Sequence, residues 1–158
     1  MRRAESCMPT DLWETVKKMS EIVTLHFQVD GDDFTSAGQA SVQVKKGLRQ
    51  LGIAPEIIRK VSIAMYEGEI NMVIHAGGGE ADVMIHEDHI EIVLKDHGPG
   101  IANLDLAMQE GFSTAPDNIR SLGFGAGMGL PNMKRYTDFM EIDTELGRGT
   151  CITMKVML

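Results

Sequence analysis

The chain has 158 residues, of which 43% are hydrophobic and 24% are charged, as in an ordinary globular domain. This length fits one domain with a hydrophobic core of its own. The net charge of −8 argues against nucleic acid or an anionic membrane surface as the main partner, because both bind basic patches. Cys7 and Cys151 lie far apart and form no disulfide framework, which favours a reducing cytoplasm.

Residues 1–21 are predicted to be an N-terminal region separate from the domain that follows. Residues 1–8 are interpreted as a disordered tail. A short amphipathic helix comes next, with apolar side chains at helical spacing: Leu12, Trp13, Val16 and Met19. This helix packs on its own domain, or it docks a partner or a second copy, and the sequence leaves both open. No apolar run approaches the ~20 residues that cross a membrane, so no membrane partner is expected.

The first half of the domain, from residue 22, predicts a strand, two helices and two strands. The strands are expected over about 22–29, 81–86 and 90–95, and the helices over about 33–51 and 55–75. Gly52 ends the first helix, and Pro55 opens the second at a favoured first-turn position. A run of three glycines, 77–79, is expected to stop that helix.

The second half predicts a long connector, a helix and two closing strands. The helix is expected over about 128–137, and the strands over about 139–145 and 150–158. The last strand alternates, with Ile152, Met154, Val156 and Leu158 expected to face inward. Because helices and hairpins are segregated, the sequence predicts an α+β fold: a two-layer α/β sandwich with a mostly antiparallel sheet and helices on one face.

Glu67 and Asn71 lie one turn apart on the second helix, between two apolar flanks. Buried groups of this kind need partners, so a satisfied core hydrogen bond or a partly exposed polar stripe is the alternative to a functional pair. The amide oxygen of Asn71 is a suitable Mg²⁺ ligand, and a nearby glutamate can polarise a hydroxyl for attack on a phosphoryl group.

Asp96 and two glycine-rich turns form the second candidate element. Asp96 ends a strand, where its carboxylate can accept a hydrogen bond from the exocyclic amine of adenine. The later glycines, Gly123 to Gly129, precede a helix and can present backbone N–H groups to phosphate. A flexible hinge is the alternative interpretation of that run. The connector over 111–126 is interpreted as a lid, since long loops in compact domains are usually functional.

Four segments in this order resemble the motifs of the GHKL (Bergerat-fold) ATP-binding superfamily over residues 22–158. They are the N box at 67–71, the G1 box at 96–100, the G2 box at 127–130 and the closing Gly-x-Gly-Thr element at 147–150. Within the superfamily, the chain is most similar to the small serine/threonine kinases of bacterial partner-switching systems, which include the anti-sigma factor kinases and the stressosome switch kinase. Segments 110–114 and 125–131, with Lys134 and Arg135, especially resemble the switch-kinase branch.

The resemblance implies a role for each matching residue, with ATP and Mg²⁺ as cofactors. Glu67 would be the general base, Asn71 the Mg²⁺ ligand and Asp96 the adenine reader. Backbone and hydroxyl contacts to the nucleotide would come from the remaining motif residues: Gly98 and Gly100 at the base, Gly125, Gly127, Met128 and Gly129 at the phosphates, and Thr150 on the adenine side. Arg120 in the lid is the candidate cation at the γ-phosphate, with Lys134 or Arg135 behind it.

The expected function is therefore ATP-dependent phosphorylation of a serine or threonine on a STAS-domain antagonist. An ATP-dependent anti-sigma or switch module with little phosphotransfer is the alternative. A sensor histidine kinase domain is less favoured, because no phosphoacceptor-histidine hairpin precedes the domain. A sigma factor and a downstream phosphatase are further candidate partners, and the chain is a candidate homodimer.

The histidines outside these motifs show no metal-ligand spacing, and we interpret them as scattered: His26, His86, His89 and His97. His75 continues the stripe of Glu67 and Asn71, and we expect it to make a structural hydrogen bond.

Overall fold

The computed structural model describes residues 22–117 and 127–158. The predicted N-terminal helix, Arg120 and Gly125 lie outside these residues. The described elements are, in order, β1 (Val23–Asp30), α3 (Gln39–Gln50), α4 (Pro55–Ala76), β2 (Gly78–Ile85), β3 (His89–Lys95), α5 (Leu104–Ala107), α7 (Gly129–Arg135), β4 (Phe139–Glu145) and β5 (Gly149–Met157).

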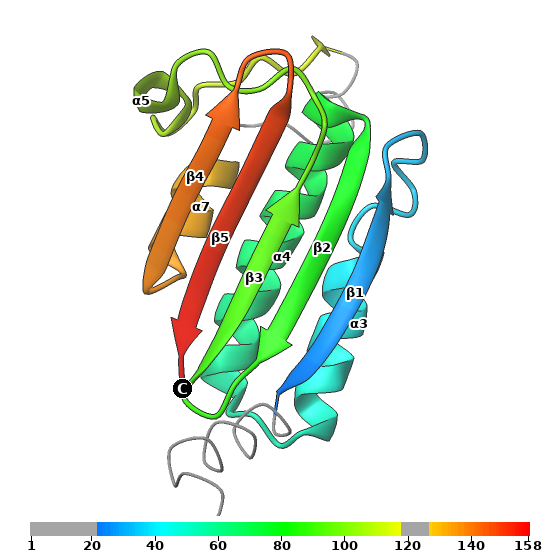
Figure 1. Cartoon of the computed structure of the whole chain (residues 1–158), viewed down its shortest axis with the longest axis vertical. Helices are drawn as coiled ribbons and strands as arrows, with labels where there is room; N and C mark the ends of the chain where they lie inside the picture. Colours follow the sequence, from blue (N-terminus) through cyan, green and yellow to red (C-terminus); the bar gives the residue numbers. More distant parts are fainter. Residues whose placement is uncertain (1–21, 118–126) are drawn as a thin grey trace, which may run out of the picture.

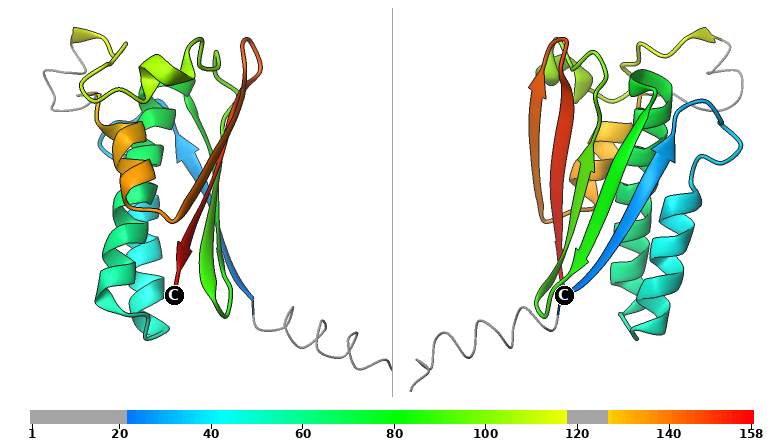
Figure 2. Two further views of the ribbon diagram at one scale, coloured as in Figure 1. Left: turned by 90° about the vertical axis from the view of Figure 1, so that its left-hand side faces the viewer. Right: turned by 45° about the vertical axis from the view of Figure 1, so that its right-hand side comes forward.

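The five strands form one sheet in the order β1-β2-β3-β5-β4, and every neighbouring pair is antiparallel (Figure 1). The helices α3, α4 and α7 lie together on one face of this sheet, while the other face has no helix of the described chain on it (Figure 2). The predicted α+β fold, a two-layer sandwich, is therefore confirmed.

The core lies between the sheet and the helices, and the alternation of the strands builds it. Buried residues of β2, β3 and β5 share one face of the sheet: Ala81, Val83, Ile85, Ile90, Ile92, Leu94, Ile152, Met154 and Val156. From the helix layer, Val61 and Met65 of α4 and Met133 of α7 are fully buried against them. Burying each large apolar side chain contributes about 1.5–3 kcal/mol relative to leaving it exposed.

Gly68 lets α4 lie close to the sheet in the turn that carries the functional pair. A Cβ at this position would lie 2.0 Å from Cδ1 of Leu94 on β3, a distance that no packed side chain adopts. A side chain at residue 68 would require the side chain of Leu94 to move. Glycine therefore leaves room for Leu94 of β3 against the turn of α4 that carries Glu67.

Three element boundaries differ from the sequence prediction. β2 begins at Gly78, within the glycine run that stops α4, whereas the sequence predicts the strand from about residue 81; a Cβ at Gly78 would lie 2.2 Å from the carbonyl oxygen of Val29, so glycine allows the two strands to pair there. Leu158 was expected to face inward, but it follows the end of β5 and is 49% exposed. The third difference is the start of α3.

α3 begins at Gln39, although the sequence pattern predicts a helix from about residue 33. Gly38 precedes it with a φ of 97°, in the left-handed region that interrupts a helix. The cap comes from α4: the buried carboxylate of Glu69 accepts hydrogen bonds from the backbone N–H groups of Gly38 at 2.7 Å, Ala40 at 3.3 Å and Ser41 at 2.7 Å. A carboxylate at this end also matches the helix dipole.

Replacing Glu69 by glutamine should therefore lower the free energy of unfolding by about 2 kcal/mol. The amide keeps one acceptor oxygen, but its NH₂ group faces backbone N–H donors in a buried place. Urea unfolding followed by circular dichroism measures the change, with Glu56→Gln as the matched control, because Glu56 is exposed in the first turn of the same helix. Equal stability of the two variants would contradict the capping role.

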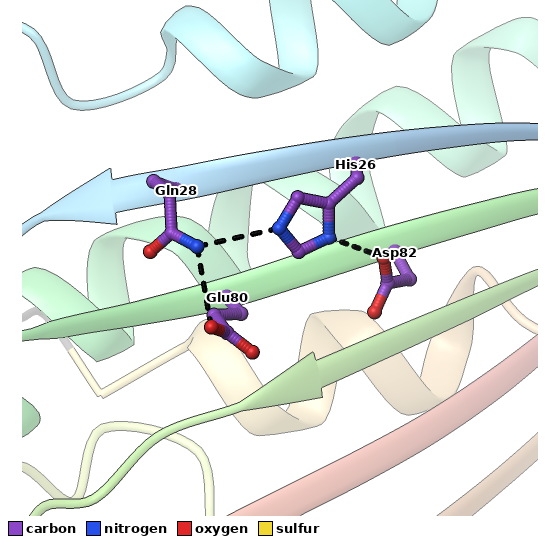
Figure 3. A network of polar contacts seen from close by, with 4 residues as sticks. All are labelled: His26, Gln28, Glu80 and Asp82. Carbon is purple, nitrogen blue, oxygen red and sulfur yellow. Dashed lines mark hydrogen bonds and ion pairs between the residues drawn. The ribbon is translucent and has the colours of Figure 1, made fainter.

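The face of the sheet opposite the helices carries polar cross-strand contacts between β1 and β2. His26 bonds to Asp82 through Nδ1, and Gln28 contacts both Nε2 of His26 and the carboxylate of Glu80 (Figure 3). The hydrogen bond with Asp82 raises the pKa of His26 above its ordinary value. All four side chains are solvated, so this network contributes little to stability.

Candidate active site

A cavity of about 510 Å³ lies where β3 ends, between α4, α7 and the loops around them. This volume falls in the range of small-molecule and cofactor sites. The predicted site residues that line it are Glu67, Asn71, Asp96, Gly100, Gly127, Met128, Gly129 and Thr150. The fold therefore brings together residues of all four motifs, which are spread over more than eighty positions of the sequence.

Glu67 reaches the cavity from α4, and a side chain of α7 orients it. Nδ2 of Asn132 donates a hydrogen bond to Oε1 of Glu67 at 3.1 Å. This bond engages one of the two carboxylate oxygens, and the second oxygen of a carboxylate can accept a further hydrogen bond. Sequence reasoning missed Asn132, whose only signal is its position in the first turns of the helix that follows the glycine run.

Asn71 lies one turn further along α4 and meets the start of α7. A Cβ at Gly129 would lie 2.9 Å from both Nδ2 and Oδ1 of Asn71, so a larger residue there would require the amide to move. The first N–H groups of a helix have no acceptor within that helix, and those at the start of α7 can bind phosphate oxygens. An amide oxygen and backbone donors thus adjoin each other at this end of the cavity.

Asp96 follows β3 directly and is held by the backbone on both sides. Its Oδ1 accepts hydrogen bonds from the N–H groups of Gly98 at 3.0 Å and Thr150 at 3.1 Å. Its own N–H donates to the carbonyl oxygen of Thr150 at 2.9 Å. With Oδ1 engaged twice, Oδ2 is the atom that can accept a hydrogen bond from a ligand in the cavity.

The closing Gly-x-Gly-Thr element supports Asp96 from β5. A Cβ at Gly149 would lie 2.2 Å from the carbonyl oxygen of Asp96, which explains why the element needs glycine there. The hydroxyl of Thr150 bonds to that of Thr144 at 2.9 Å. Gly98 does not line the cavity; it approaches Ala76 so closely that a Cβ would lie 2.6 Å from the Cβ of that residue.

The two ends of the predicted lid lie against each other. The N–H of Gly111 donates to the carbonyl oxygen of Gly127 at 3.0 Å. Gly127 has a φ of 80°, and a Cβ there would lie 2.4 Å from the carbonyl carbon of Gly111. Phe112 and Ser113 follow this junction and line the cavity. Residues 118–126, with Arg120 and Gly125, lie outside the described part of the chain.

The charged groups near the cavity differ in what they can offer a phosphate. Desolvation lowers the pKa of His75, and the charge of Asp96 opposes this only in part. Arg135 forms an ion pair with Glu110, with 2.5 Å between Nη2 and Oε1. Neither Lys134 nor Arg135 is among the residues that line the cavity. Within the described residues, the phosphate end therefore depends on backbone donors and Asn71.

Among the described residues, no helix is long and apolar enough to cross a membrane. Two solved structures share the fold. The RsbU and RsbW domains of a Mycobacterium tuberculosis protein superpose with a TM-score of 0.57 at 16% identity, covering 85% of this chain and 32% of that chain. In the SiaB-SiaC complex of Pseudomonas aeruginosa, the match has a TM-score of 0.53 at 11% identity, covering 96% of this chain and 99% of that chain.

Comparison of the sequence with known proteins gives closer matches. An anti-sigma F factor of Clostridium beijerinckii is 33% identical over 122 residues, which cover 73% of this chain and 82% of that protein. An anti-sigma F factor of Geobacillus thermodenitrificans is 28% identical, with 73% and 80% covered. Residues 56–158 match the model of the histidine kinase-, DNA gyrase B- and HSP90-like ATPases. The chain therefore belongs to this ATPase family, and anti-sigma F factors are among its relatives.

Proposed function

We propose that this chain is a Mg²⁺-dependent serine/threonine protein kinase of a partner-switching system, which phosphorylates a STAS-domain antagonist. The observation that carries the proposal is the convergence of Glu67, Asn71 and Asp96 on one glycine-lined cavity. Its relatives named anti-sigma F factor support the regulatory setting. The substrate class rests on the resemblance of the motif segments to the kinases of partner switching.

The donor set of the cavity fits adenosine triphosphate with one Mg²⁺ ion. The carboxylate of Asp96, fixed by two backbone N–H groups, matches the exocyclic amine of adenine. The close contact between Gly129 and Asn71 places an amide oxygen beside backbone donors, as Mg²⁺ and phosphate require. Mg²⁺ bound to Asn71 would offset the charge of the β- and γ-phosphates.

Glu67 would act on the protein substrate. One oxygen of its carboxylate is held by Asn132, and the other accepts the proton of the serine or threonine hydroxyl. The hydroxyl oxygen forms a bond to the γ-phosphorus while the bond from that phosphorus to the β–γ bridging oxygen breaks. ADP leaves with the electron pair of that bond. Arg120, the proposed γ-phosphate cation, belongs to the lid residues outside the described part.

Incubation of the purified chain with γ-labelled ATP, Mg²⁺ and a purified STAS-domain protein from the same genome tests the proposal. We expect one labelled serine or threonine on the STAS protein, identified by mass spectrometry, and no label when Mg²⁺ is removed with a chelator. The control is a STAS protein with that residue replaced by alanine. ATP binding without transfer to any STAS protein of the genome would overturn the kinase assignment.

The second candidate function is a binding module that uses ATP as a conformational ligand. The name of the anti-sigma F relatives favours it, because that name denotes a protein that opposes a sigma factor. In this case a sigma factor would bind the chain in the presence of ATP, and binding would not require Glu67. A pull-down of purified sigma factor by wild-type chain and by Glu67→Gln distinguishes capture from phosphotransfer.

A further inference from the structure

Two histidines that the sequence leaves unrelated lie together with a carboxylate at the turn between β2 and β3. His86, His89 and Glu91 each offer one ligand atom, and these atoms all lie within 4.8 Å of one another. The register explains the cluster: the N–H of His86 bonds to the carbonyl oxygen of His89, and Met84 pairs with Glu91. All three side chains therefore belong to the face of the sheet opposite the helices.

His86 has an unmet requirement for a partner. Its Nε2 is buried and has no hydrogen bond among the described residues. The nearest carboxylate oxygen, Oε2 of Glu91, lies 3.8 Å away, which is too long for a hydrogen bond. Leaving a buried polar atom without a partner costs about 1–3 kcal/mol. A cation between Nε2 and Oε2 would satisfy both atoms, since zinc lies about 2.0–2.2 Å from nitrogen and oxygen ligands.

A carboxylate already engages Nδ1 of His89, as is common for metal-ligand histidines. Oδ1 of Asp88 lies 2.7 Å from its Nδ1, an arrangement that fixes the proton there and leaves the lone pair on Nε2. Ligand histidines are commonly held in this way by a carboxylate. Lys155 faces Glu91 across the sheet, but its ammonium lies over the ring of Phe139, 5.3 Å from the centroid.

We propose that His86, His89 and Glu91 form a binding site for a divalent transition metal, with Zn²⁺ as the best-matched ion. Two imidazoles and one carboxylate suit zinc, and a water molecule would complete a tetrahedral set. The two rings are now stacked, with centroids 4.3 Å apart and planes 13° from parallel. A metal ion binds in the plane of an imidazole ring, so one ion can bind both stacked rings only if one ring rotates. Metal binding should therefore change the environment of these two rings.

The proposed metal site lies far from the nucleotide cavity. The turn between β2 and β3 is at the end of the sheet where the chain terminates, whereas β3 ends at the opposite side (Figure 1). His89 is the first residue of β3 and Asp96 follows its last, so about 20 Å of strand separates them. The proposed metal site therefore shares no residue with the nucleotide cavity.

Calorimetric titration of the chelator-treated, nucleotide-free chain with Zn²⁺ tests the proposal. We expect one ion per chain. Loss of a residue that only orients a ligand costs about 10- to 100-fold in metal affinity, so Asp88→Asn should weaken Zn²⁺ binding by about that factor. His86→Gln and His89→Gln each remove a ligand and should weaken Zn²⁺ binding by more. The matched control is His26→Gln, since His26 is on the same face but pairs with Asp82. Unchanged Zn²⁺ affinity in the His86 and His89 variants would overturn the assignment.

Spectroscopy of the wild-type chain tests the proposal without any variant, so its result does not depend on whether the variants fold. Co²⁺ bound at this site should give the intense visible absorption of a tetrahedral ion and should be displaced by Zn²⁺. The ring proton signals of His86 and His89 should shift on Zn²⁺ addition, because their stack opens. Weak octahedral absorption, or shifts confined to the other histidines, would show that the cluster does not hold the metal.

Discussion

Replacement of Glu67 by glutamine should lower the rate of phosphotransfer by about 10²–10⁴-fold, the usual contribution of a general base. Glutamine has the same shape and keeps an oxygen that accepts from Asn132, so the contact between α4 and α7 survives. What it loses is the second carboxylate oxygen that takes the hydroxyl proton. Single-turnover transfer of labelled phosphate to the STAS partner measures the change.

A measurement of ATP affinity distinguishes the loss of the general base from damage to the nucleotide cavity. The Glu67→Gln variant should bind ATP as tightly as wild type by calorimetry, because Asp96, Asn71 and the glycines are untouched. Glu56→Gln serves as the control for transfer, since Glu56 is exposed at the start of the same helix. A Glu67→Gln chain that transfers phosphate at the wild-type rate would remove Glu67 from the role of base.

Replacement of Asp96 by asparagine should weaken ATP binding by about 100-fold, or ~2.7 kcal/mol. The asparagine oxygen would take the place of Oδ1, because the N–H groups of Gly98 and Thr150 need an acceptor there. Its NH₂ group would then face the exocyclic amine of adenine, so two donors would oppose each other. Turning the amide the other way would restore that contact but leave both backbone donors unpaired.

Calorimetry with ATP measures this loss, and a nucleotide without the exocyclic amine identifies its cause. Inosine triphosphate has a carbonyl at that position, which can accept from the new NH₂ group, so its affinity for the variant should fall much less or rise. Asp143→Asn is the matched control, because Asp143 is exposed on the far face of the sheet. Equal loss for ATP and inosine triphosphate would assign Asp96 a purely structural role.

The sequence predicted the strands and α4 well, because the spacing of apolar residues indicates which face of a strand or helix is buried. Ile90, Ile92 and Leu94 alternate with polar or smaller residues, and all three are buried. The glycine motifs were equally informative, since a Cβ at Gly149 would collide with the backbone of Asp96 and a Cβ at Gly129 would crowd the amide of Asn71. A collision with backbone strongly favours glycine at Gly149, and such a requirement can be recognised in the sequence.

Features that depend on contacts between distant residues could not be predicted in this way. Glu69 caps a helix that begins thirty residues earlier, and no local pattern distinguishes it from any other helical glutamate. Asn132 reaches Glu67 only because α7 packs on α4. His86 and His89 meet because of the register of the β2–β3 turn, which their spacing of three did not reveal.

The hydrogen bond between Gly111 and Gly127 affects where the domain can accept insertions during evolution. This hydrogen bond joins the two ends of the connector, Gly111 and Gly127, directly. The entropic cost of closing a loop grows only with the logarithm of its length, at about 0.6 kcal/mol for each doubling. Insertions after Asp117, beyond the cavity-lining Ser113 and Thr114 and the buried Ala115, should therefore leave the fold nearly as stable.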